Sequence, residues 1–188
     1  ECGIEFLSTA FTLQSVDLLS KINLKRWKIP SGEINNFPLL KKVAKYNQPT
    51  IISTGMSGIA EIENAIEVLL ENKLAKENIT VLHCTSAYPA PFQDINLRAI
   101  KTIKECFDVN VGYSDHTLGI EASIAAVALG AKVIEKHITL DKKSEVYPSF
   151  QHEGTEFIHV ISGRMVYRHG LDTFDMMPGD SLFFDAQA

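Results

Sequence analysis

The chain has 188 residues and a formal net charge of −5, and 45% of its residues are hydrophobic against 22% charged. This is the composition of a globular protein that can bury a core. The acidic balance argues against a general binder of nucleic acid or of anionic membranes, because such proteins need a basic face to neutralise phosphates. We therefore expect neither nucleic acid nor a membrane among its partners.

Short runs rich in β-branched and aromatic residues alternate with helix-like segments over most of the chain. In the segment 58–72, for example, Ile59, Ile62 and Ile66 recur at the spacing of an amphipathic helix. By the same criteria, strands are predicted at 5–8, 26–29, 50–53, 79–84, 109–113 and 132–137. Helices are predicted at 13–21, 37–46, 58–72, 95–106 and 119–129.

The strand starts are about 22 to 30 residues apart, which is the length of one βα unit. This spacing predicts a parallel α/β fold, either a (β/α) barrel or an open doubly wound sheet. No Gly-rich phosphate turn of the GxGxxG or Walker type is present, whereas nearly every strand ends in small polar or charged residues, as strands at a barrel mouth do. The pattern favours a partial TIM-type (β/α) barrel of about six βα units, two short of a closed barrel.

The helical period disappears after Lys143, and the remaining residues are typical of an all-β segment. Strands are predicted at 156–161, 164–168 and 181–185, separated by turn sequences such as Pro178-Gly179-Asp180. We therefore predict two domains, an incomplete barrel at 1–143 and a small β segment at 144–188.

The cysteines and the amino terminus bear on cellular context. Cys2, Cys84 and Cys106 are odd in number, lie far apart and form no CxxC pair, so neither a disulfide framework nor a zinc ribbon is indicated. We expect a cytoplasmic location, and no run of about 18 apolar residues predicts a membrane span. The chain starts ECGIEFLS without Met, and we expect it to begin inside a longer protein.

Two stretches, VGYSDHT at 111–117 and VIEKHIT at 133–139, each deliver a histidine where a buried strand gives way to a loop. Chemistry gathers at the carboxyl ends of parallel strands, so His116 and His137 can converge on one point. Two neutral imidazoles with open coordination positions suit a divalent metal. The alternative is that each is a structural histidine. The adjacent Asp115 and Glu135 are expected to orient the imidazoles or a bound water.

Six motifs, in this order, resemble the catalytic barrel of the N-acetylneuraminate (sialic acid) synthases and their legionaminate and pseudaminate synthase relatives: FLSTAF, KIPSGEINNFPLL, TIISTGM, HCTSAYPAP, GYSDHT and VIEKHIT. The resemblance covers about residues 3–142, roughly strands three to eight of that barrel. It implies condensation of phosphoenolpyruvate with the open-chain aldehyde of an N-acetylated hexosamine. The products are a nine-carbon 2-keto sugar acid and phosphate. The resemblance also implies Mn²⁺ or Mg²⁺, held by His116 and His137.

The resemblance further implies roles for residues at the predicted strand ends, with Glu135 and Asp115 as catalytic residues. Glu33 and Tyr88 match positions that contact the amino-sugar, although a purely structural loop is the alternative. Contacts with phosphoenolpyruvate are implied for Thr9, Lys28, Ser31, Ser53, Ser86 and Ser114. Cationic and hydroxyl donors are what a phosphate and a carboxylate require. As alternatives, Lys28 extends to solvent and the serines cap the following helices.

The tail resembles a different family, the cupins, through FQHEGTEFIHVISGRM and FDMMPGDSLFFD. His152 and Glu156 match metal-ligand positions of that pattern, but Phe150 stands where many cupins have a further histidine. A metal-free β module that supports a homodimer is therefore preferred. The synthase family's first two strands and its antifreeze-like domain have no counterpart in this sequence.

Two other functions stay open. The first is a non-catalytic binding or assembly protein, built from a truncated barrel and a cupin-like dimerisation module. The second is another phosphoenolpyruvate-condensing aldolase, such as a heptulosonate synthase, although KIPSGE and GYSDHT favour the sialic acid type. The sequence does not distinguish N-acetylmannosamine from a diacetamido sugar as substrate.

Overall fold

The computed structural model describes residues 7–22, 24–137, 155–160, 163–169 and 172–185. The chain divides into two compact units, one of which is Leu7–Asp141 and the other of which contains Lys142–Ala188. The domain boundary predicted after residue 143 lies outside the described residues and stays a prediction.

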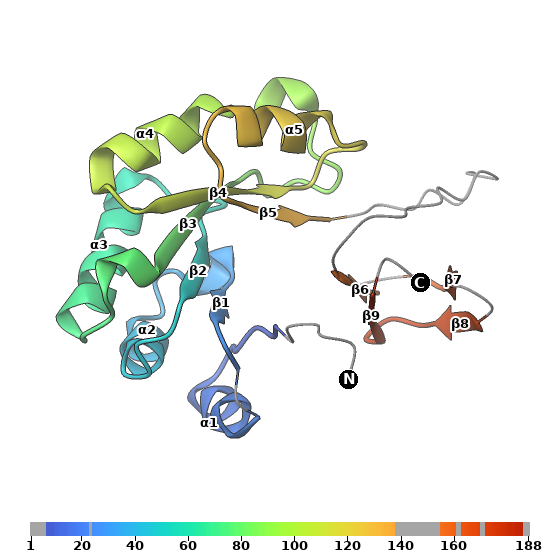
Figure 1. The fold of residues 1–188 in the computed structure, drawn as a ribbon, viewed down its shortest axis with the longest axis horizontal. Coiled ribbons are helices and arrows are strands. Elements are labelled where there is room, and N and C mark those ends of the chain that lie inside the picture. The colour runs from blue at the N-terminus through green and yellow to red at the C-terminus, as the bar shows by residue number, and fades with distance from the viewer. Residues whose placement is uncertain (1–6, 23, 138–154, 161–162, 170–171, 186–188) are drawn as a thin grey trace. The chain divides into compact units, whose positions relative to one another are not determined.

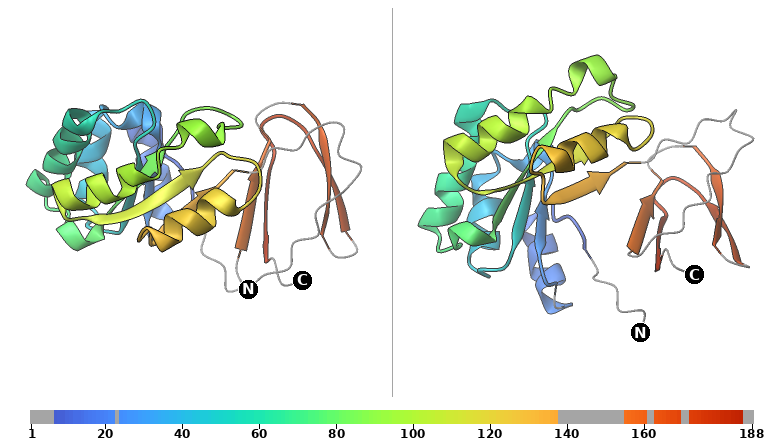
Figure 2. Two further views of the ribbon diagram at one scale, coloured as in Figure 1. Left: turned by 90° about the horizontal axis from the view of Figure 1, so that it is seen from above. Right: turned by 45° about the horizontal axis from the view of Figure 1, so that its top comes forward.

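The first unit is a curled, parallel five-stranded sheet with helices along its outer side (Figures 1 and 2). The strands pair in chain order: β1 (Trp27–Ile29), β2 (Thr50–Ser53), β3 (Ile79–Cys84), β4 (Asn110–Asp115) and β5 (Val133–Lys136). The helices are α1 (Leu13–Lys21), α2 (Phe37–Ala44), α3 (Ile59–Glu71), α4 (Arg98–Phe107) and α5 (Glu121–Ala128). Short 3₁₀ turns follow at Ser31–Glu33, Lys76–Asn78 and Phe92–Asp94. The predicted partial (β/α) barrel is confirmed as a half-barrel.

The elements lie within three residues of their predicted bounds because local signals fix them. The Thr12 hydroxyl accepts a hydrogen bond from the Ser15 amide and so caps α1. Asn36 caps α2 in the same way by accepting from the Leu39 amide. The strand predicted at 5–8 lies largely outside the described residues. Thr9, just after it, forms a parallel bridge to Lys28, so the chain before α1 runs beside the carboxyl end of β1.

Alternate residues of each strand face opposite sides of the sheet. In β1, Trp27 and Ile29 belong to the hydrophobic core under the helices, whereas Lys28 between them bonds to Ser53 of β2 on the concave side. The core side is apolar and continuous from β1 to β4. Its largest fully buried side chains include Trp27, Leu39, Leu40, Ile52, Leu69, Ile79, Ile100 and Tyr113. The concave side carries the polar residues, and it is the side on which a site can form.

The second unit consists of strands alone among its described residues, which confirms the all-β prediction for the carboxy-terminal segment. Strand β6 (Thr155–His159) pairs antiparallel with β9 (Ser181–Asp185), and β7 (Met165–His169) with β8 (Asp172–Met176). The sequence did not predict β8. His152 lies outside the described residues, and the side chain of Glu156 is likewise not described, so the cupin-like metal positions stay a prediction.

Among the described residues, no helix combines the length and the apolarity that crossing a bilayer requires.

Gly112 of β4 offers a direct test of the packing between β3 and β5. A Cβ atom at this position would lie 2.4 Å from the Val133 carbonyl oxygen and 2.5 Å from Cδ2 of Leu82. We expect Gly112→Ala to lower the free energy of unfolding by about 1–3 kcal/mol, as overpacking does. Urea denaturation followed by the fluorescence of Trp27, the single tryptophan, measures this unit.

Gly32→Ala is the matched control, because a Cβ atom there would meet nothing within 4 Å. Its effect is expected to stay within about 0.5 kcal/mol. Equal stability of the two variants would contradict the packing described for β4.

Candidate metal and substrate site

The two histidines singled out from the sequence come together at the carboxyl ends of β4 and β5. Their ring centroids are 4.2 Å apart and the rings are nearly perpendicular. Tyr88, from the loop after β3, stacks on His116 with centroids 3.9 Å apart and meets the ring of His137 edge-on at 5.6 Å. Three aromatic rings from three consecutive βα units thus form one cluster.

A backbone contact fixes the proton position on His116. Its Nδ1 lies 2.7 Å from the carbonyl oxygen of Thr85. Because a carbonyl oxygen only accepts, Nδ1 carries the proton, and Nε2 of the neutral ring keeps its lone pair. Nε2 lies 3.3 Å from the Ser114 hydroxyl. This is the tautomer in which an imidazole binds a metal through Nε2 while its other nitrogen is held by a backbone acceptor.

His137 has the complementary property of an unused nitrogen. Its Nδ1 is buried and has no hydrogen-bond partner, an unfavourable state that a ligand would relieve. Burial lowers the pKa of His137, and the neighbouring His116 lowers it further. Burial also lowers the pKa of His116. Both rings are therefore neutral at pH 7, and neutral imidazole is the form that binds metal ions.

These donors fit a divalent cation with open coordination positions. Within the described part of the chain, no three His, Cys, Asp or Glu side chains are grouped closely enough to hold a metal by themselves. A cation at this point would be held by the two imidazoles, with substrate oxygens or water to complete the shell. A catalytic metal keeps such positions open, whereas a structural zinc site closes them.

An ion pair between the buried Lys28 and the half-buried Glu135 lies beside the rings on the concave side. The Lys28 ammonium donates to the Ser53 hydroxyl at 2.8 Å and lies 3.4 Å from Oε1 of Glu135. The Ser114 hydroxyl donates to Oε2 of Glu135 at 2.6 Å. Burial raises the pKa of Glu135, but Lys28 and the Ser114 hydrogen bond outweigh it and hold that pKa below its usual value. Lys28 is only 6% exposed, so it does not extend to solvent.

The loops after β1, β2 and β3 bring more hydroxyl groups to this position. The Gly55 amide donates to the Ser31 hydroxyl at 2.9 Å. A Cβ atom on Gly55 would fall 2.1 Å from Oγ of Ser86 and 2.9 Å from Oγ of Ser31, so this glycine is what lets the two serines approach. Cys84 lies 3.2 Å from the same point. Burial raises the pKa of its thiol, which disfavours a thiolate.

Three further predicted residues lie around this cluster. Thr9 is joined to Lys28 by the parallel bridge described above. Glu33 ends the short turn after β1, and one of its carboxylate oxygens accepts from the Asn36 side chain at 2.6 Å. Tyr88 is 60% exposed, so a substrate can reach its ring.

Asp115 lies on the opposite face of β4 from the imidazoles. One carboxylate oxygen accepts from the amide and hydroxyl of Thr117, at 2.9 and 2.8 Å. The other accepts from the Ser123 hydroxyl at 2.5 Å and lies 3.1 Å from the Lys136 ammonium. The expected direct contact between Asp115 and the imidazole rings is therefore not made, because neighbouring residues of a strand face opposite sides.

Comparison with known proteins assigns the family of this chain. A family model described as the NeuB family matches residues 1–155, and a cupin domain model matches residues 136–188. The chain belongs to the NeuB family. The resemblance to sialic acid synthases is thereby confirmed, and so is the cupin domain at the carboxyl end.

Relatives within the NeuB family carry informative names. The chain is 60% identical over 142 residues to the N,N'-diacetyllegionaminic acid synthase of Campylobacter jejuni. The aligned residues make up 76% of this chain and 42% of that protein. The chain is 43% identical over 143 residues to the N-acetylneuraminate-9-phosphate synthase of Homo sapiens, covering 76% and 39%. The crystal structure of the sialic acid synthetase of Leptospira borgpetersenii in complex with citrate superposes with a TM-score of 0.66 at 39% identity, covering 71% and 46%. The chain thus spans about two fifths of the length of the curated relatives.

Sequence reasoning missed two contributors to this NeuB-family site. The Thr85 carbonyl that orients His116 has no sequence signal, because every residue carries a carbonyl group. Lys136 had one, since it follows Glu135 as a second charged residue at the end of β5, but it was not predicted.

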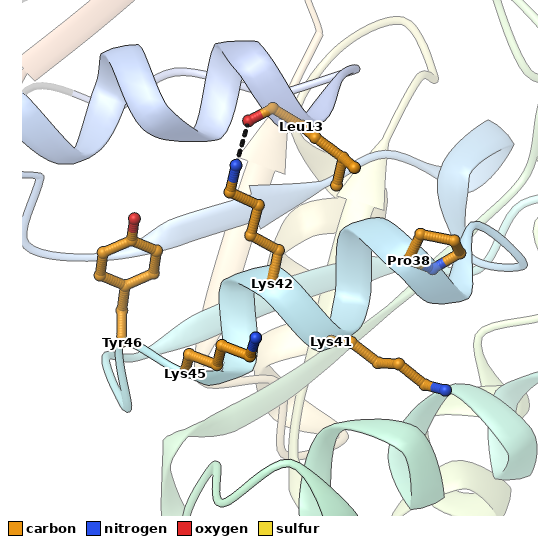
Figure 3. A pocket seen from close by; sticks show the side chains of 6 residues that line it. All are labelled: Leu13, Pro38, Lys41, Lys42, Lys45 and Tyr46. Atoms are coloured by element: carbon orange, nitrogen blue, oxygen red, sulfur yellow. Dashed lines mark hydrogen bonds between the residues drawn. The ribbon is translucent and has the colours of Figure 1, made fainter.

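A separate cavity of about 370 Å³ lies on the helix side, between α1 and α2 (Figure 3). Lys42 crosses it, donating to the Leu13 carbonyl at 2.8 Å and pairing with Asp17 at 2.6 Å. The other lining residues are Pro38, Lys41, Lys45 and Tyr46. It shares no residue with the strand-end cluster.

The lowered pKa values of the histidines predict a pH dependence of stability. A neutral buried imidazole takes up a proton less readily in the folded than in the unfolded state, where its pKa is about 6.5. The unfolded state therefore binds more protons as the pH falls below about 6.5, and the free energy of unfolding decreases. We expect His137→Gln to reduce this decrease between about pH 7.5 and 5.5, measured by urea denaturation with Trp27 fluorescence. Identical pH slopes in the variant and the wild type would contradict a buried, neutral His137.

Proposed function

We propose that the chain contributes to the condensation of phosphoenolpyruvate with the open-chain aldehyde of an N-acetylated hexosamine, either N-acetylmannosamine or a diacetamido analogue. The products are a nine-carbon 2-keto sugar acid and phosphate, and Mn²⁺ or Mg²⁺ is held by His116 and His137. The observation that carries the proposal is the pair of neutral imidazoles, whose ring centroids are 4.2 Å apart, beside the Lys28–Glu135 ion pair. Support also comes from relatives named as synthases of sialic and legionaminic acids.

The imidazoles and Tyr88 define the sugar side of the site. A bound divalent cation would supply Lewis-acid polarisation of the aldehyde carbonyl. The chain contributes the Nε2 lone pair of His116, oriented by the Thr85 carbonyl, and the unpartnered Nδ1 of His137. The exposed ring of Tyr88, stacked on His116, provides a surface against which the sugar packs, and Glu33 provides an acceptor for sugar hydroxyl groups.

Lys28 and its hydroxyl neighbours define the phosphoenolpyruvate side. The ammonium group, shielded from water, offers a strong electrostatic contact to a phosphate or carboxylate. Its ammonium group bonds to the Ser53 hydroxyl, and the Ser114 hydroxyl bonds to its partner Glu135. The hydroxyl groups of Ser31 and Ser86 lie close together beside Gly55, and the backbone of Thr9 bridges to that of Lys28; we assign these hydroxyl groups to the phosphoenolpyruvate side as well. Because Lys28 is already neutralised by Glu135, the site is charge-balanced before the anion arrives.

Glu135 is placed for the later part of the reaction. C3 of phosphoenolpyruvate forms the new carbon–carbon bond with the aldehyde carbon, and C2 becomes electron-poor. A water molecule then adds to C2, and the bond between C2 and the bridging phosphate oxygen breaks. Phosphate leaves with that oxygen, the oxygen of the water becomes the 2-keto oxygen, and its two protons pass to the new sugar alkoxide and to the departing phosphate. With its pKa held low, Glu135 stays ionised and can stabilise the positive charge at C2 and orient the water.

Cellular location and assembly belong to the same proposal. Cys84 and Cys106 are free thiols, which suits the reducing cytoplasm. A homodimer formed through the cupin domain stays a prediction.

Coupled phosphate release together with sedimentation tests this function. We expect release only when phosphoenolpyruvate, the amino-sugar and Mn²⁺ are all present. We expect His116→Gln and His137→Gln to lower the rate at least about a hundred-fold, because each removes a ligand of the electrophilic metal. A well-folded oligomer that releases no phosphate under these conditions would favour the binding or assembly alternative.

A second test separates the two cationic regions of the molecule. Lys28→Met is expected to weaken binding of phosphoenolpyruvate about ten-fold or more, as loss of a charge-assisted hydrogen bond does. Lys41→Met, in the α1–α2 cavity of Figure 3, is the matched control and should leave the affinity unchanged. Titration calorimetry measures both. A larger loss for Lys41→Met would move the anion site to the helix side.

A further inference from the structure

We propose that Lys136 and Asp115 form a positioning pair that fixes the separation of the His116 and His137 imidazoles. The inference rests on the proposed function, because the separation matters through the cation that the two rings would hold. The hydrogen bonds and ion pairs described for these two side chains go to residues other than the histidines, so we infer that the pair acts on the rings through the backbone.

The register of β4 and β5 makes the pair a link between the two histidine-bearing strand ends. Asp115 and Lys136 are direct partners in the parallel pairing, and each is followed at once by one of the histidines. The His137 amide donates to the Asp115 carbonyl at 2.9 Å, which continues the ladder by one further bond. A contact between the two side chains therefore holds the last paired residues before both rings.

Lys136 also contacts the chain on the far side of His116. Its ammonium donates to the Thr117 carbonyl at 2.5 Å, in addition to its 3.1 Å contact with the Asp115 carboxylate. His116 lies between these two contacts in the sequence. One lysine thus brackets the backbone of one histidine while preceding the other by a single residue.

The Asp115 carboxylate is held in place by several contacts in the loop. Asp115 is fully buried, and the side chain of Lys136 is 24% exposed. The Thr117 amide, the Thr117 hydroxyl, the Ser123 hydroxyl and Lys136 together satisfy both carboxylate oxygens. A buried charge that lost Lys136 would be left without its counter-ion, so the loop would rearrange around it.

The same two strands, β4 and β5, supply a matched control at their amino ends. Lys132, just before β5, donates to the side chain of Asn110 at the start of β4 at 3.0 Å. It joins the neighbouring strands in the same manner, but at their amino ends. Removing it tests cross-strand lysine contacts in general, without touching the histidine loops.

The experiment compares Mn²⁺ affinity of Lys136→Met, Lys136→Arg and Lys132→Met by titration calorimetry on the full chain. We expect Lys136→Met to bind Mn²⁺ about ten- to a hundred-fold more weakly, the usual effect of losing an outer contact that orients metal ligands. Lys136→Arg keeps the charge and should stay within about three-fold of wild type, and so should Lys132→Met. Trp27 fluorescence verifies folding.

A second readout needs no metal. Long-range ¹H–¹⁵N spectra of the metal-free protein should show His116 protonated at Nδ1 in the wild type and altered imidazole signals in Lys136→Met. If Lys136→Met does not fold, Ser123→Ala, which removes one neutral bond to Asp115, should still weaken Mn²⁺ binding by a few-fold.

The possible failures are distinguishable. No Mn²⁺ binding by the wild type would remove the proposed function, and the imidazole spectra would still decide whether the pair positions the rings. Mn²⁺ binding by Lys136→Met equal to wild type, unchanged imidazole signals in that variant, or an equal loss in Lys132→Met would overturn the positioning pair.

Discussion

The parallel pairing of β4 with β5 is the constraint on which the candidate site depends. In this register Ser114 faces Glu135 on the concave side, Asp115 faces Lys136 on the helix side, and the histidines continue the alternation at the strand ends. A one-residue slip in the register of either strand would turn that strand's side chains to the opposite face of the sheet. The two imidazoles, the Glu135 carboxylate and the Asp115–Lys136 ion pair therefore share a single structural cause, the register of β4 and β5.

The electrostatics of the concave side follow from the same arrangement. Burial keeps both imidazoles neutral, and Lys28 and Glu135 balance each other. In the proposed reaction, a cation and an anionic substrate would then enter together without leaving a large uncompensated charge in the site. The hydroxyl groups around Lys28 add hydrogen bonds without adding charge, which suits a substrate that must also leave.

The sequence was sufficient for the half-barrel and for the convergence of His116 and His137, because the βα spacing and the polar strand ends are local signals. It placed Asp115 with the wrong neighbours because adjacency in a motif was given more weight than the period of two in a strand, which sends Asp115 and His116 to opposite faces. Strand β8 was missed because DTFDM has few β-branched residues and follows a turn sequence. The bond from His116 to the Thr85 carbonyl depends on tertiary packing and has no residue-type signature.

Anomalous scattering at the manganese absorption edge, from crystals soaked with Mn²⁺ and phosphoenolpyruvate, tests the central claim most directly. The account predicts one strong peak about 2.0–2.3 Å from a nitrogen of each of His116 and His137, on the concave side of the sheet and within reach of phosphoenolpyruvate. A peak at another position, or no peak while phosphoenolpyruvate occupies the strand ends, would contradict it.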